Sequence, residues 1–200
     1  MIDLGGKRMD IIAVIEKYIE LSVRRDNLKN TIENSKRYYN YAKIEGDMAF
    51  HDGDYQLEKG YNDSARHHIE TQEKAEKDLS QVEQLLEFTH QTYTRAVESL
   101  DEVQLKEAAI TMSVKKIDVE RKIEELSERR SWATSKGDTA FANHNFEEEQ
   151  EYNRISSDCY VEIERIKPTL HYYESFVNNL NYHANKKVDN DFGPTGPVRK

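Results

Sequence analysis

The residues best suited to acid–base or metal chemistry are few in this chain of 200 residues. Glu87-Phe-Thr-His90 has the spacing that places a carboxylate and an imidazole on one helix face, as in di-iron carboxylate bundles. Such centres need a second motif of this kind and further inward glutamates, and the sequence contains no second one. The remaining candidate ligands for a metal are His51, Asp54 and His144, in segments where turns and helix caps use the same residue types.

Signals for catalysis are otherwise missing from the sequence. There is no glycine-rich phosphate loop, no HExxH motif and no nucleophile elbow. Cys159 is the only cysteine, so no intramolecular disulfide can form, and its position in an apolar heptad seam predicts a buried, inert thiol. We expect no enzyme and no cofactor. The alternative is a metal-binding bundle or metal-dependent enzyme that uses Glu87, His90, His68 or the turn histidines.

The charge of the chain limits its partners. Its net charge is −9, and basic pairs such as Lys115-Lys116 are interleaved with glutamates, so we expect no nucleic-acid binding. A third alternative is an acidic mimic of nucleic acid, supported by runs such as Glu147-Glu148-Glu149. No stretch approaches the roughly 20 apolar residues of a membrane span, and the N-terminal segment lacks a signal-peptide core. We therefore expect a cytoplasmic protein without a membrane partner.

Apolar residues at heptad spacing predict four long helices along the chain. Only three prolines occur, and two of them are Pro194 and Pro197, so long helices are allowed. One seam runs from Ile11 to Ala42 in a helix from Asp10 to about Phe50. Three further seams extend from Tyr61 to Ala96, from Leu105 to Ala133 and from Tyr152 to Leu180. The last of them contains Pro168, where we expect a kink.

The sequence repeats itself at an offset of 91 residues. Between residues 41–62 and 132–153, 8 of 22 positions are identical without a gap, where composition alone gives roughly one or two. Each segment joins two predicted helices, so the repeat indicates two tandem helical hairpins with their turns at these positions. Gly46 and Gly137 would let the paired helices approach closely, and Asp54 and Asn145 are suitable N-caps for the returning helices.

The first of these segments, "GDMAFHDGDYQLEKGYNDSA", resembles the helix-turn-helix of a tetratricopeptide repeat. The resemblance rests on Gly46, the turn Gly53-Asp54-Tyr55 and the small residue Ala65. It covers about 25 residues per copy, and the second copy has His144 and Asn145 in place of the turn's Gly-Asp. Tetratricopeptide repeats recur every ~34 residues, whereas this repeat recurs at 91. The resemblance implies peptide or protein binding, without assigning binding residues.

The predicted fold is therefore all-α: an elongated bundle of four long amphipathic helices in two tandem hairpins with coiled-coil-like packing, both turns lying at one end. We expect a flexible N-terminus at residues 1–9, hairpins at 10–98 and 99–184, and a disordered tail at 185–200. Ser99-Leu-Asp-Glu102 supplies the N-cap between the hairpins.

Aromatic residues indicate the function. Tyr and Trp are favoured at protein interfaces because they bury a large area at low entropy cost. The sequence predicts a non-catalytic interaction protein, meaning a scaffold, adaptor or inhibitor, whose partner is another protein or a second copy of the chain. The predicted partner site comprises aromatic residues near the two turns: Tyr38, Tyr41, Tyr55, Trp132 and Phe146.

Overall fold

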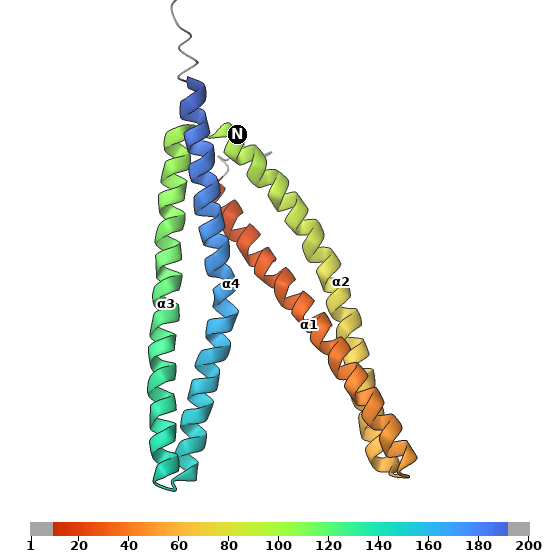
Figure 1. The fold of residues 1–200 in the computed structure, drawn as a ribbon. Helices are drawn as coiled ribbons and strands as arrows, with labels where there is room; N and C mark the ends of the chain where they lie inside the picture. The colour runs from red at the N-terminus through yellow and green to blue at the C-terminus, as the bar shows by residue number, and fades with distance from the viewer. Residues whose placement is uncertain (1–9, 192–200) are drawn as a thin grey trace, which may run out of the picture. The chain divides into compact units, whose positions relative to one another are not determined.

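The protein is all-α over the part of the chain that the structure, a computed structural model, describes, which is residues 10–191. Its four helices are α1 (Ile11–His51), α2 (Tyr55–Ser99), α3 (Glu102–Ala142) and α4 (Phe146–Asp191), and no strand occurs among the described residues. Figure 1 shows α1 turning back into α2 and α3 turning back into α4. The predicted pair of tandem helical hairpins is confirmed.

The chain divides into two compact units whose boundaries differ from the predicted hairpins at 10–98 and 99–184. Residues 20–92 form one unit, which we call the α1/α2 unit. Residues 11–19 and 93–191 form the other, which we call the α3/α4 unit, so both ends of the first hairpin join the second. The predicted elongated shape, and the prediction that both turns lie at one end, depend on how the two units are placed. Both therefore stay predictions.

In the α1/α2 unit the two helices meet through a narrow apolar seam. Its buried apolar residues are small or aliphatic and include Leu21, Ile32, Ala42, Ala49, Ala75, Val82 and Leu86. Two ion pairs cross between the helices beside this seam, Lys29 to Glu83 at 3.9 Å and Lys36 to Glu76 at 3.7 Å. Both pairs are largely exposed to solvent, so they help to set the register and add little stability.

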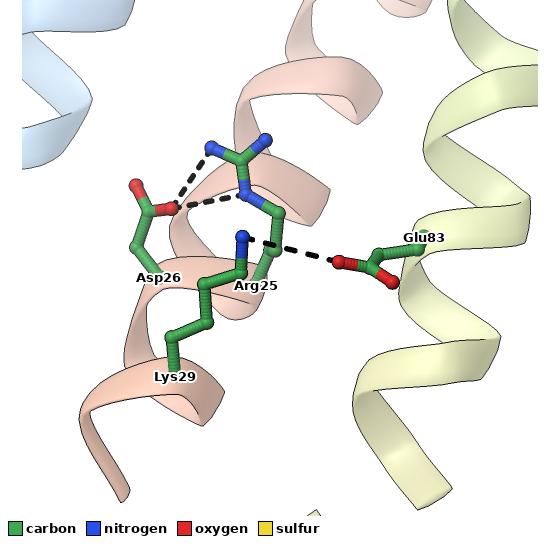
Figure 2. A network of polar contacts seen from close by, with 4 residues as sticks. All are labelled: Arg25, Asp26, Lys29 and Glu83. Carbon is green, nitrogen blue, oxygen red and sulfur yellow. Dashed lines mark hydrogen bonds and ion pairs between the residues drawn. The ribbon is translucent and has the colours of Figure 1, made fainter. Parts of the chain in front are cut away.

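Arg25 is a polar residue at heptad spacing within the seam that runs from Ile11 to Ala42, and Lys116 and Arg130 lie likewise in the seam from Leu105 to Ala133. Figure 2 shows its guanidinium beside the neighbouring carboxylate of Asp26, with Nε and Nη2 donating to Oδ1 at 3.0 and 2.9 Å, while Lys29 reaches toward Glu83 on α2. The seam residue 91 positions later, Lys116, lies 3.7 Å from Glu174 of α4. A third one, Arg130, stacks over the ring of Tyr160 on α4 at 4.7 Å. Lys116 and Arg130 thus link neighbouring helices.

The α3/α4 unit has the thicker core, because four chain segments contribute to it. Its buried side chains include Ile11, Ile15 and Ile19 of α1, Ala96 and Val97 of α2, Leu105 and Met112 of α3, and Leu180 and Ala184 of α4. The ring of Phe176 meets Tyr18 and Tyr93 edge to face, with centroids 5.4 and 5.1 Å apart. A salt bridge between Lys115 and Glu16 joins α3 to the first turns of α1.

The connection between the hairpins lies where the sequence predicts it, and its capping residue lies within the predicted stretch 99–102. Ser99 ends α2, and its hydroxyl donates to the carbonyl of Ala96 at 2.8 Å. Asp101 is the N-cap of α3 and forms a capping box with Gln104: Asp101 Oδ1 accepts the Gln104 N–H at 2.8 Å, and Gln104 Oε1 accepts the Asp101 N–H at 3.2 Å. The reciprocal pair satisfies two backbone N–H groups at the start of α3.

Helix α4 continues without interruption through Pro168 and past Ala184 to Asp191. Lys187 contributes to the ordering of this last part, since its ammonium donates to the carbonyls of Glu98 and Leu100 at the end of α2. The tail expected at residues 185–200 thus begins with helix, and residues 192–200 lie outside the described part, as do residues 1–9.

Candidate protein-binding tips

The two hairpin turns have the same backbone structure. We call residues 38–62 the first tip and residues 129–153 the second tip. The Asp54 N–H donates to the Ala49 carbonyl at 2.9 Å, and the Asn145 N–H donates to the Ala140 carbonyl at the same distance. Gly53 likewise bonds to Phe50 at 3.1 Å, and His144 bonds to Phe141 at 3.0 Å. The repeat in the sequence is therefore a repeat in structure.

The returning helices are capped as predicted. Asp54 Oδ1 accepts the N–H of Leu57 at 3.0 Å, and Asn145 Oδ1 accepts the N–H of Glu148 at 3.4 Å. Each side chain thereby satisfies one of the four N–H groups that a helix start leaves without a partner.

Close helix contact at the predicted glycines fixes each tip. A Cβ atom on Gly46 would lie 3.4 Å from Tyr61 Cβ, and one on Gly137 would lie 3.2 Å from Asn153 Oδ1 and 3.6 Å from Tyr152 Cβ. A Cβ atom on Gly137 would be closer to Asn153 than an ordinary contact allows, whereas one on Gly46 would make an ordinary van der Waals contact with Tyr61. Both glycines therefore lie where the two helices of a hairpin pack against each other.

One aromatic pair occurs at the same place in both tips. In the first tip Tyr41 packs edge to face against Tyr61 with ring centroids 6.4 Å apart. In the second tip Trp132 packs edge to face against Tyr152 at 5.5 Å. Tyr41 and Trp132 nevertheless remain 56% and 49% exposed. These rings therefore cover the outside of the helix contact and leave about half of their surface to solvent.

The other predicted partner residues are also exposed. Tyr55 packs against Phe50 with centroids 6.3 Å apart, and Phe146 packs against Phe141 at 6.4 Å, again at equivalent positions. Tyr38 stacks on His68 at 5.3 Å with nearly parallel rings. This last pair has no counterpart, because Arg129 and Cys159 stand 91 positions later. The structure thus brings Tyr38, Tyr41 and Tyr55 into the first tip and Trp132 and Phe146 into the second.

The phenol of Tyr61 is perturbed by its surroundings in the first tip. Partial burial raises its pKa above the ordinary value for tyrosine, and the nearby Tyr41 and Glu45 raise it further. The Tyr61 phenol therefore stays protonated further into the alkaline range, and its ring packs against Tyr41.

The residues predicted as possible metal ligands lie at different places in the fold and make other interactions. Asp54 uses its carboxylate as a cap, His144 lies in the second turn with its ring near Phe146, and His51 lies at the end of α1. Glu87 accepts a hydrogen bond from Gln91 at 2.8 Å on the exposed side of α2, where His90 is also exposed. Among the described residues no three His, Cys, Asp or Glu side chains form a group that could hold a metal ion.

Comparisons of the chain with protein-family models, with curated proteins and with solved structures found no match. Within residues 10–191, none of the helices has the length of apolar sequence needed to cross a membrane.

Sequence reasoning missed part of the exposed apolar surface of the first tip. Ile44 and Met48 are 59% and 56% exposed and follow Tyr41 at i+3 and i+7, so the three side chains share one outer face of α1. The spacing was visible in the sequence. It was masked by the competing seam of Ala42, Gly46 and Ala49, which packs against α2.

Proposed function

We propose that the protein is a non-catalytic interaction protein, a scaffold, adaptor or inhibitor, that binds another protein through its two hairpin tips. The observation that supports this proposal most strongly is the exposure of Tyr41 and Trp132 at equivalent positions of the two copies. Half-exposed aromatic rings held rigid by a second ring are typical of the residues that dominate protein interfaces.

The alternative role for the rings of Tyr41 and Trp132 is to fill the core between the paired helices. Each makes one edge-to-face contact, worth about 0.5–1.5 kcal/mol, yet leaves much of its apolar surface in water. The seam beneath is already closed by glycine and alanine, so the fold does not need such large side chains there. A partner that covers either ring would recover its unused surface.

The repetition of the site offers a gain in affinity. Two equivalent sites can bind two copies of a partner's recognition element, with avidity that exceeds either contact alone. The proposal includes a cytoplasmic location, because a lone buried cysteine suits a reducing compartment.

Capture of partners from an extract of the source cell tests the proposal. The baits are the wild-type chain, Tyr41→Ala/Trp132→Ala, and the control Phe88→Ala/Tyr182→Ala, which removes two exposed rings outside the tips. Circular dichroism first establishes that all three are equally helical. We expect proteins captured by the wild type and the control to be lost from the tip variant, whereas equal capture by all three would refute the tips as the site.

A chain that ends at Asp191 separates the tips from the tail. We expect it to capture the same partners as the full chain. Loss of partners from this truncated chain, with capture retained by Tyr41→Ala/Trp132→Ala, would move the recognition element to residues 192–200.

A further inference from the structure

The two tips share a backbone but differ in the outer face of their first helix. The first tip carries Tyr41, Ile44 and Met48 along this face, all more than half exposed. The corresponding residues of the second tip are Trp132, Ser135 and Thr139. We call the three residues of the first tip the apolar ridge. One copy of the duplicated hairpin therefore has an apolar surface that the other copy lacks.

The ridge has the shape that suits a helix. Its residues follow one another at i, i+3 and i+7, which is the spacing of side chains along the seam between two packed helices. The exposed parts of three such side chains amount to a patch on the order of 300 Å², comparable with functional patches on soluble proteins. Methionine adapts its shape to different partner side chains, so the ridge can accept more than one sequence.

The charges around the ridge are predominantly acidic. Three basic residues occur between residues 37 and 59: Lys43, Lys59 and Arg37, which lies one turn before Tyr41 and pairs with Glu33 of α1. Against them stand five carboxylates: Glu45, Asp47, Asp52, Asp54 and Glu58. A partner with lysines or arginines flanking its apolar residues would be attracted to this rim, and an acidic partner or an anionic membrane would be repelled.

We propose that the apolar ridge of the first tip binds a basic amphipathic helix of the partner protein. The partner's apolar side chains pack on Tyr41, Ile44 and Met48, and its basic side chains lie over the acidic rim. This inference rests on the proposed function and deepens it, because it names the chemistry of the partner and assigns unequal tasks to the two tips.

A synthetic helix tests the inference on the full chain. The probe is an 18-residue peptide of leucine and lysine with leucines at i, i+3, i+4 and i+7, and the control peptide has glutamate in place of lysine. We expect isothermal titration calorimetry to show one site for the lysine peptide with a dissociation constant of about 10–100 μM, as suits a small patch. We expect no binding of the glutamate peptide, and binding of both peptides alike would overturn the charge argument.

The second copy of the repeat supplies the matched variants. Ile44→Ser/Met48→Thr installs in the first tip the residues that the second tip has, without changing any charge. We expect it to weaken peptide binding at least about tenfold. The reciprocal Ser135→Ile/Thr139→Met should add a second peptide site, because Asp138 and Glu147 also make the second tip acidic. Unchanged binding by the first variant would show attraction by overall charge alone and overturn the proposal.

Sedimentation equilibrium of the same proteins tests whether a second copy of the chain binds the ridge instead. Self-association that is lost in Ile44→Ser/Met48→Thr, without binding of the lysine peptide, would assign the ridge to a dimer and contradict the inference. If the cell-extract captures still depend on Tyr41 and Trp132 while the peptide fails to bind, the inference fails and the proposed function stands.

Discussion

Gly53 and His144 occupy the same position in the two turns, and both have a positive φ, 79° for Gly53 and 58° for His144. Glycine adopts this left-handed conformation freely, whereas a residue with a Cβ atom is strained there by roughly 1–2 kcal/mol. The second turn thus keeps the conformation of the first with a less suitable residue.

We therefore expect His144→Gly to stabilise the protein. Relief of the strain is partly offset by the greater freedom of glycine in the unfolded chain, so the free energy of unfolding should rise by up to about 1 kcal/mol. Urea unfolding followed by circular dichroism measures the change. Gly53→His should be destabilising by a similar amount, and a stabilising Gly53→His would contradict the account of the turns.

Ser22→Ala should also raise the free energy of unfolding, by about 1 kcal/mol. The Ser22 hydroxyl is fully buried and has no hydrogen-bond partner, so it is desolvated without compensation. Ser113→Ala is the matched control, because the Ser113 hydroxyl donates to the carbonyl of Ala109 at 2.9 Å. The control should be neutral or destabilising. Equal effects of the two substitutions would argue against the unpaired hydroxyl as the cause.

Pro168→Ala should stabilise α4, by about 1–3 kcal/mol. Proline cannot donate the backbone hydrogen bond of the helix interior, and its ring crowds the preceding turn. Thermal unfolding of wild type and variant checks this expectation. A lower melting temperature for the variant would indicate that the proline has a packing role that the helix alone does not explain.

Tyr93 should be the tyrosine most resistant to ionisation. It is 7% exposed, its hydroxyl donates to Asn179 Oδ1 at 2.6 Å, and burial raises its pKa far above that of a free tyrosine. A tyrosine in the unfolded chain releases its proton near pH 10. The stabilising effect of the neutral folded form is thus complete below about pH 10 and is lost as the pH rises further.

Spectrophotometric titration of the phenols measures this effect. We expect one tyrosine to ionise only when the protein unfolds at alkaline pH, and we expect this component to be absent from Tyr93→Phe. The substitution should cost about 1 kcal/mol at neutral pH through the lost hydrogen bond. A late-titrating phenol that persists in Tyr93→Phe would contradict the assignment.

The helices and turns could be predicted from the sequence because their signals are local. The heptad seam that starts at Ile11 and the N-caps Asp54 and Asn145 are patterns within a few turns of helix. The 91-residue repeat is found by comparing the chain with itself. The unit boundary could not be predicted in this way. Ile15 and Ile19 are buried because three other chain segments surround residues 11–19, and a seam for one partner helix does not include them.

The candidate site was predicted in part for a similar reason. Exposure of Tyr41 and Trp132 depends on which face of the helix meets its partner, and the alanines and glycines of the seam determine that face. Ile44 and Met48 compete with this seam in the hydrophobic pattern, so only the structure assigns them to the outside. What binds there depends on a partner, about which intramolecular packing carries no information.

Trp132 offers the most direct measurement of the central claim, because it is the only tryptophan in the chain and is half exposed in the second tip. Its fluorescence is recorded with the purified captured partner, and its accessibility is measured by acrylamide quenching. The account predicts a blue shift of the emission and a quenching constant reduced at least about twofold in the complex, as the ring leaves water. Full binding of the partner with unchanged emission and unchanged quenching would contradict the claim that the tips form the partner site.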